Sequence, residues 1–153
     1  MNNDKKVIWL SIGLFVFILI ADRITKYLAV RYLQVKSIHI MPWIDLVYVT
    51  NKGIVFGLFS DTKFNLLFLS IASLLIISIL MIYWFKPIPY PIIAMILAGG
   101  VGNLIDRIQY GHVVDFIKIH QFYVFNVADA SITISIILFL WFYLFKANGK
   151  NTV

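Results

Sequence analysis

Residues 7–21 read VIWLSIGLFVFILIA, fifteen consecutive positions without a charged side chain. Lys5 and Lys6 precede this run, as in a signal peptide, but no small-x-small cleavage pattern follows it. The helical pattern instead continues through residues 22–30. A helix needs about 20 apolar residues to cross a bilayer. The stretch therefore predicts a retained transmembrane span over about residues 6–28.

Hydrophobic residues make up 61% of the 153-residue chain and charged residues 13%, with a mean hydropathy of +0.91. These values lie far outside those of a water-soluble domain, so the sequence predicts one integral membrane domain over residues 1–153. The absence of cysteine excludes thiol nucleophiles, cysteine metal sites and disulfides. The net charge of +6 is scattered among apolar runs. This pattern favours membrane lipid headgroups, not nucleic acid, as the counter-charge.

Three further apolar stretches predict spans over about residues 64–85, 91–108 and 126–145. Prolines at positions 87, 89 and 91 separate the second span from the third. Four spans in sequence predict an all-α membrane protein, an up-and-down four-helix bundle with both termini on one side.

The connection over residues 32–63 contains an alternating pattern. Ile38 and Ile40, and then Ile44, Leu46 and Tyr48, are separated by single residues. This period is typical of one or two short strands, so we expect a small extramembrane β-strand cradle between the first and second spans. Residues 54–59 are apolar but too few to cross a bilayer, and we expect them at the membrane surface or over the mouth of the bundle.

All seven acidic residues are aspartates, and the predicted topology brings six of them to one face. We expect this face to carry the function, because only Asp4 lies on the face with the termini. The face with the termini holds only five of the thirteen Lys and Arg residues, which argues against placing that face in the cytoplasm. Its net charge of +4, against +2 for the opposite face, favours a cytoplasmic location for it. We predict cytoplasmic termini. The six aspartates are Asp22, Asp45, Asp61, Asp106, Asp115 and Asp129.

Asp115 and Asp129 are candidates for a catalytic pair. Asp115 stands between apolar neighbours, where a buried carboxylate must be paired, hydrogen-bonded or protonated. Asp129 follows Asn126 by three residues at the start of the fourth span, so a helix cap is an equally good interpretation. Two close carboxylates share one proton and can activate water, as in aspartic proteases. Spacing alone does not establish that a loop carrying Asp115 returns to Asp129.

Asn103, Asp106 and Arg107 share one face at the end of the third span. They are either a structural ion pair with an asparagine beside it or a polar platform for a peptide backbone. The three histidines show no metal-binding spacing, and no serine-nucleophile or dinucleotide motif is present, so we expect neither a metal nor a cofactor. A small transporter would place an acid near the bilayer midplane, whereas the central thirds of these spans are uncharged.

Five blocks in order resemble the signature blocks of lipoprotein signal peptidase, the bacterial type II signal peptidase. The resemblance runs from the first span to the last. The chain departs from the family pattern at Ile54 and Val55, where small residues are usual, and in its compact connection between the candidate aspartates. The blocks are DRITK at 22–26, NKG at 51–53 with FG at 56–57, GNLIDR at 102–107, VVDF at 113–116 and FNVAD at 125–129.

The resemblance implies an aspartic endopeptidase that removes the signal peptide from a prolipoprotein, cutting before the cysteine that carries a diacylglyceryl group. Its active site would lie on the outer face of the bacterial cytoplasmic membrane, under a flap at residues 54–59, and we expect a monomer. The matching positions imply a catalytic pair, Asp115 and Asp129; substrate-binding residues Asn51, Gly53, Asn103, Arg107 and Asn126; and structural support from Asp22, Lys26 and Asp106.

Overall fold

The computed structural model describes residues 3–52, 71, 75, 88–120 and 123–148. Nearly all of the predicted second span lies outside these residues, as do Gly53 and the predicted flap, so the count of four spans stays a prediction. The described elements are α1 (Asn3–Tyr32), β1 (Ile38–Met41), β2 (Ile44–Asn51), α3 (Tyr90–Tyr110), β3 (Val113–Ile119), β4 (Tyr123–Phe125) and α4 (Val127–Asn148).

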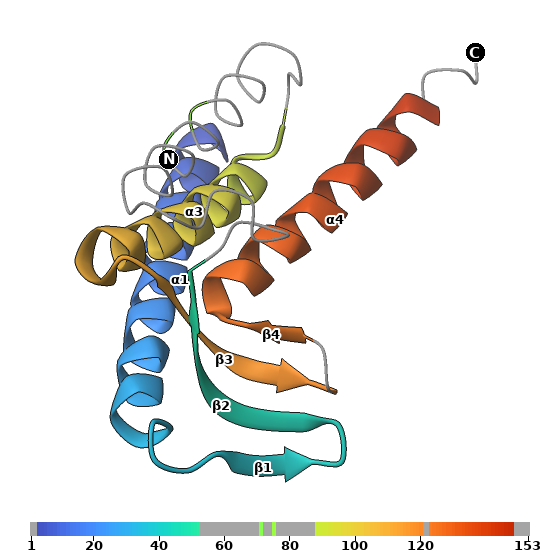
Figure 1. The fold of residues 1–153 in the computed structure, drawn as a ribbon. Helices are drawn as coiled ribbons and strands as arrows, with labels where there is room; N and C mark the ends of the chain where they lie inside the picture. Colours follow the sequence, from blue (N-terminus) through green and yellow to red (C-terminus); the bar gives the residue numbers. More distant parts are fainter. Residues whose placement is uncertain (1–2, 53–70, 72–74, 76–87, 121–122, 149–153) are drawn as a thin grey trace.

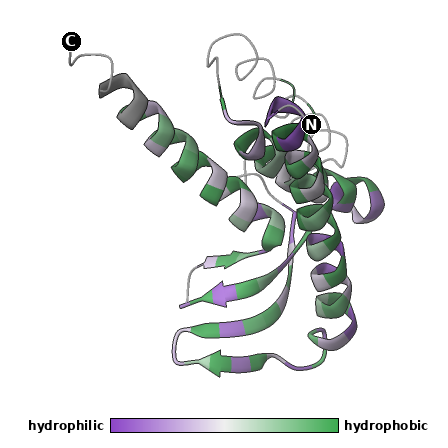
Figure 2. Ribbon diagram, turned by 180° about the vertical axis from the view of Figure 1, so that it is seen from behind, coloured by the Kyte–Doolittle hydropathy of each residue, from purple (hydrophilic) through white to green (hydrophobic). Residues whose placement is uncertain are grey.

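Three described helices, α1, α3 and α4, are long and apolar enough to cross a membrane. They match the predicted spans over residues 6–28, 91–108 and 126–145, and hydrophobic residues cover most of their length (Figure 2). Large apolar side chains such as Trp9, Leu10 and Phe17 are more than 60% exposed, which a membrane protein tolerates because lipid covers them. The protein is therefore an integral membrane protein.

The helices α3 and α4 approach closely at two glycines of α3. A Cβ atom on Gly99 would lie 2.4 Å from the carbonyl oxygen of Ala128, and one on Gly102 would lie 3.3 Å from the Cβ of Ala128 and 2.8 Å from Oδ2 of Asp22 on α1. Small residues allow this approach in a membrane, where close packing rather than water exclusion joins helices. Ser131 Oγ also donates a hydrogen bond of 2.8 Å to the carbonyl oxygen of Met95. The start of α4 is thus held against the middle of α3.

The sheet corrects the prediction of an all-α protein with strands only between the first two spans. It has four antiparallel strands in the order β1-β2-β3-β4, and the segment after α3 supplies β3 and β4 (Figure 1). Asp115 therefore lies on strand β3 rather than on a loop. The alternation that identifies half-buried strands is missing because Val113, Val114, Asp115 and Phe116 are all buried. A hairpin of β1 and β2 alone would also be marginally stable.

Two features join the sheet to the helices. Gly111 ends α3 in a left-handed conformation, with a φ of 72°, and its N–H donates to the carbonyl oxygen of Arg107. Strand β3 begins two residues later. A core cluster of Ala29, Leu33, Val114 and Phe116 packs the C-terminal half of α1 against this strand. The end of α3, the start of β3 and the start of α4 consequently meet beside α1 (Figure 1).

Candidate active site

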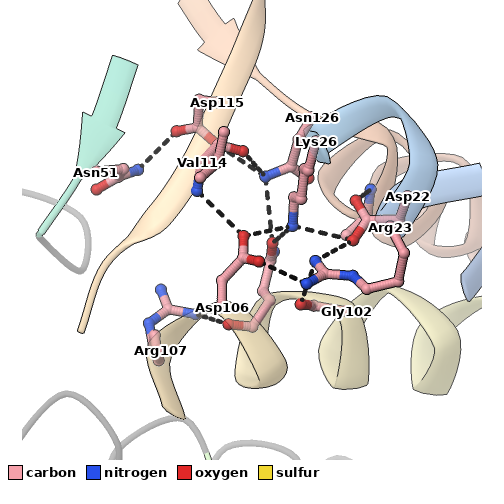
Figure 3. A network of polar contacts seen from close by, with 12 residues as sticks. Asp22, Arg23, Lys26, Asn51, Gly102, Asp106, Arg107, Val114, Asp115 and Asn126 are labelled. Atoms are coloured by element: carbon pink, nitrogen blue, oxygen red, sulfur yellow. Dashed lines mark hydrogen bonds and ion pairs between the residues drawn. The ribbon is translucent and has the colours of Figure 1, made fainter. Parts of the chain in front are cut away.

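Four charged side chains from α1 and α3 form a buried ion-pair cluster (Figure 3). Arg23 bridges Asp22 and Asp106 with nitrogen–oxygen distances of 2.7 Å each, and Lys26 bridges the same two carboxylates at 3.0 and 2.9 Å. Both aspartates are fully buried and Lys26 is 3% exposed. Two cations balance two anions, which is the condition under which buried charges are tolerated.

The two aspartates of this cluster also hold backbone amides. Asp22 Oδ1 accepts the N–H of Ala128 at 3.0 Å, and Asp106 Oδ2 accepts the N–H of Val114 at 3.1 Å. Ala128 directly precedes Asp129, and Val114 directly precedes Asp115. Each buried carboxylate therefore fixes the peptide immediately before one of the two candidate catalytic residues.

Asp115 is 2% exposed and accepts two amide hydrogen bonds. Asn126 Nδ2 donates to its Oδ1 at 2.7 Å, and Asn51 Nδ2 donates to its Oδ2 at 3.0 Å. Burial raises the pKa of Asp115 from 3.8 to about 6; the charge of Asp129 acts in the same direction, and the two amides and Lys26 oppose the rise. Asp115 thus keeps its proton to a higher pH than an ordinary aspartate does.

Asp129 and Asn126 form a reciprocal cap at the start of α4. The N–H of Asp129 donates to Asn126 Oδ1 at 2.9 Å, and the N–H of Asn126 donates to Asp129 Oδ2 at 3.3 Å. The capping arrangement expected from the sequence is therefore present. The other oxygen of Asp129, Oδ1, accepts Asn103 Nδ2 at 2.7 Å. The side chain is half-buried, so it is reachable from outside the cluster.

A pair of asparagines connects the two candidate carboxylates. Asn126 Nδ2, which contacts Asp115, also donates to Asn103 Oδ1 at 3.1 Å, and Asn103 in turn donates to Asp129. Lys26 Nζ donates to the same Asn103 oxygen at 2.9 Å. The ammonium can only donate, so it holds the Asn103 oxygen toward α1 and its NH₂ group toward Asp129. The carboxylates belong to one hydrogen-bonded network.

Arg107 lies at the edge of this network. It is half-buried, and its hydrogen bond to the carbonyl oxygen of Asn103 is long, at 3.5 Å. Its charge interacts with those of Asp129 and Asp115. The interpretation of Asp106 and Arg107 as a structural ion pair is wrong for the described residues, because Asp106 pairs with Arg23 and Lys26 instead.

The structure therefore brings together nearly all of the predicted site residues. Asn51 reaches the site from β2 and is exposed, whereas Gly53 lies outside the described residues. Arg23 was not among the residues predicted for the site, although its position next to Asp22 in the sequence indicated an ion-pair partner. Within the described ranges, no group of three His, Cys, Asp or Glu side chains could hold a metal ion. The site as described offers carboxylates, amides and cations.

Comparison with known proteins identifies the family of the chain. Residues 14–145 match the family model described as signal peptidase (SPase) II. The chain is 41% identical to a lipoprotein signal peptidase of Thermodesulfovibrio yellowstonii, covering 86% of this chain and 91% of that protein. It is 38% identical to a lipoprotein signal peptidase of Acinetobacter baumannii, covering 95% and 89%.

Solved structures show the same fold. A bacterial membrane enzyme determined at 2.3 Å by the in meso method superposes with a TM-score of 0.80 at 29% identity, covering 94% of this chain and 93% of that one. A second bacterial membrane enzyme, determined at 1.9 Å, gives 0.75 at 31% identity, covering 88% and 92%. The family model spans most of the sequence and the relatives extend over nearly its whole length, so the chain belongs to the signal peptidase II family of aspartic peptidases.

Proposed function

We propose that the protein removes signal peptides from prolipoproteins, cutting before a cysteine that carries a diacylglyceryl group, with Asp115 and Asp129 acting on one water molecule. The observation that supports this proposal best is the hydrogen-bonded connection of the two carboxylates through Asn126 and Asn103. Lipoprotein signal peptidases among the relatives support the class of substrate.

The two carboxylates have different surroundings, which suggests different roles. Asp129 lies half-buried in the first turn of α4, where it accepts the backbone N–H of Asn126 and the side-chain amide of Asn103. Asp115 is buried on a strand, and its pKa of about 6 favours the protonated form at and below that pH. In our proposal, the pair holds a single proton and Asp115 carries it when water binds.

The proposed reaction then conserves its protons. Asp129 takes a proton from water while the oxygen attacks the scissile carbonyl, and Asp115 gives its proton to the carbonyl oxygen. The tetrahedral diol collapses when Asp129 returns a proton to the amide nitrogen and Asp115 recovers one from a hydroxyl. The C–N bond breaks, a carboxylic acid and an amine leave, and both aspartates regain their starting states.

Asn51 and Arg107 are placed to bind the substrate backbone. Asn51 is exposed beside Asp115, and Arg107 is half-buried near Asp129, so donors stand on both sides of the pair. An extended peptide lying between them would present carbonyl oxygens to both. We assign Asn103 and Asn126 to the floor of this site, and Gly53 to its rim by family resemblance.

We further propose that this site faces outward from the bacterial cytoplasmic membrane and that both termini are cytoplasmic. The start of α1 and the end of α4 both lie on the side of the molecule away from the sheet (Figure 1). A prolipoprotein whose signal peptide crosses the membrane from the cytoplasm would then meet the carboxylates at the end of its span.

The test is cleavage of a precursor peptide in detergent, with diacylglyceryl-modified and unmodified substrate measured in parallel. We expect turnover of the modified peptide only, and loss of at least about 10³-fold in Asp115→Asn and in Asp129→Asn, as for removal of a group central to the chemistry. Asp45→Asn is the matched control, since Asp45 pairs with His39 on the β1–β2 hairpin and lies outside the network. Near-normal turnover in both active-site variants would end the dyad assignment.

A further inference from the structure

A groove of about 270 Å³ lies where the C-terminal half of α1 meets the sheet. Its floor is formed by the buried side chains of Ala29, Leu33 and Phe116, and its walls include the exposed side chains of Leu28 and Tyr32. The volume is below the roughly 300–1,000 Å³ of pockets that enclose drug-sized ligands. It suits a slender apolar chain better than a compact molecule. Thr25, Ile38 and Leu46 complete the lining.

The groove lies behind the active site rather than in it. Neighbouring side chains of a strand point to opposite faces, so Phe116 faces the groove while Asp115 faces Asn51 and Asn126. On β2, Leu46 also lines the groove, and its neighbour Asp45, which is not part of the lining, pairs with His39 of β1. The groove is therefore apolar apart from Thr25 and the ring hydroxyl of Tyr32.

Its position along α1 corresponds to the edge of the membrane. A crossing of about 20 residues that begins at Val7 ends near Lys26. The groove starts at this level with Thr25 and continues to Tyr32, in the last turn of the helix. Tyr27 and Tyr32 are both 59% exposed, as is typical of aromatic residues at the headgroup level. At this depth the upper part of an acyl chain lies directly below its phosphate.

A cation with an organised side chain lies beside Tyr32, one of the residues that line the groove. Arg31 donates a hydrogen bond of 3.0 Å from Nη1 to the hydroxyl of Tyr27, and its guanidinium lies 5.6 Å from the ring centroid of Tyr32. Within the ranges that the structure describes, no carboxylate forms an ion pair with Arg31. A guanidinium binds phosphate oxygens in pairs and is charged at all relevant pH values.

We propose that this groove binds one acyl chain of an anionic phospholipid of the surrounding bilayer, with the lipid phosphate on Arg31. The two parts of the site are joined, because Tyr32 both lines the groove and supports the guanidinium. The acyl chain would lie against Phe116, next in sequence to Asp115, and so support the strand that carries a candidate catalytic residue. This inference concerns a bound membrane lipid and does not depend on the proposed cleavage reaction.

The experiment measures lipid retained by the purified full-length protein, by native mass spectrometry after transfer from nanodiscs. Both lipids carry a phosphate, but the choline ammonium of phosphatidylcholine cancels its charge, whereas phosphatidylglycerol keeps a net negative charge for Arg31. We therefore expect phosphatidylglycerol to be retained about tenfold more than phosphatidylcholine. Arg31→Gln should remove this preference, whereas Lys36→Gln, which changes a nearby exposed cation outside the groove, should leave it unchanged.

The apolar part of the site has its own matched pair of variants. Leu28→Trp should fill the groove and lower retention of phosphatidylglycerol severalfold. Ile24→Trp, one turn earlier on α1 and also exposed, lies outside the lining and should bind lipid as the wild type does. Both positions are exposed, and melting temperatures measured in detergent establish that each variant is folded.

Four outcomes would overturn the proposal. Equal retention of the two lipids would remove the role of Arg31, and unchanged retention in Leu28→Trp would remove the groove. Displacement of the lipid by inorganic phosphate alone, or by a diacylglyceryl peptide at substrate concentration, would show a headgroup site or a substrate site instead. None of these results bears on the loss of cleavage in Asp115→Asn, so the two proposals can fail separately.

Discussion

The four aspartates of the network lie close together but differ in what compensates them. Asp22 and Asp106 share Arg23 and Lys26, with every nitrogen–oxygen distance at or below 3.0 Å. Asp115 and Asp129 instead accept neutral amide groups. A cation binds a carboxylate strongly only while it is charged, whereas neutral donors leave protonation within reach. The first pair is therefore held by ion pairs, whereas the second pair is held by hydrogen bonds from amide groups.

This difference also separates a pair that positions the site from the candidate catalytic pair. Asp106 and Asp22 accept hydrogen bonds from the backbone N–H groups of the residues directly before Asp115 and Asp129, so the first pair positions the second. Lys26 is linked to the second pair through Asn103, because the side-chain oxygen of Asn103 accepts a hydrogen bond from the Lys26 ammonium. Substitutions in the two pairs should consequently give different phenotypes.

The largest effect on stability is expected from Asp106→Ala. It would leave Arg23 and Lys26 with one carboxylate between them and the Val114 N–H without its acceptor. Breaking a buried ion pair costs about 3–5 kcal/mol. We expect a large fall in melting temperature in detergent, together with loss of cleavage.

Asp45→Ala is the control for Asp106→Ala, because its ion pair with His39 is largely exposed and such pairs are worth about 0–1 kcal/mol. If Asp106→Ala melted like the wild type yet lost all cleavage, Asp106 would belong with the reacting pair, and the distinction between the two pairs would fail.

A somewhat smaller effect should appear in the pH dependence of stability. Asp115 ionises at about 6 in the folded protein against an ordinary value of 3.8, so the folded state holds an extra proton between these values. Stability is therefore lost as the pH rises from about 4 to 7, by up to about 3 kcal/mol at roughly 1.4 kcal/mol per pKa unit. Asp115→Asn lacks this loss.

The free energy of unfolding of Asp115→Asn, measured against that of the wild type from pH 4 to 7, tests this expectation. The difference should increase in favour of the variant by up to about 3 kcal/mol across the range. A constant difference would mean that Asp115 is as fully compensated as Asp22, which would remove the contrast between the pairs.

The sequence predicted the apolar helices well because their signal is local. The run from Val7 to Ala21 is enough to identify α1, although the helix extends to Tyr32 because Asp22 and Lys26 find partners. Strand β3 was missed because burial hides the alternation around Asp115, and β4 because it has only three residues. The pairing of β3 with β2 depends on contacts between residues more than 60 positions apart.

The candidate site was predicted residue by residue, but its connections were not. The capping of Asp129 by Asn126 follows from a spacing of three residues. The link from Asn103 to Asp129 and the pairing of Arg23 with Asp106 join separate helices, so no sequence period reveals them. These long-range contacts decide which aspartates are neutralised, and for that reason the division into two pairs needed the structure.

The smallest effect is expected from Asn51→Ala. Its amide donates to Asp115 Oδ2 and favours the ionised form, so its removal should raise the pKa of Asp115 further above about 6. A neutral hydrogen bond is worth about 0.5–1.5 kcal/mol, which corresponds to roughly 0.4–1 pKa unit.

If Asp115 must be protonated when water binds, activity falls as the pH rises through this pKa. The falling limb of the kcat profile should therefore move to higher pH by that amount in Asn51→Ala, whereas Asp45→Asn leaves it in place. If Asp115 were instead the base, activity would rise with pH through its pKa, and the rising limb rather than the falling limb would move to higher pH in Asn51→Ala.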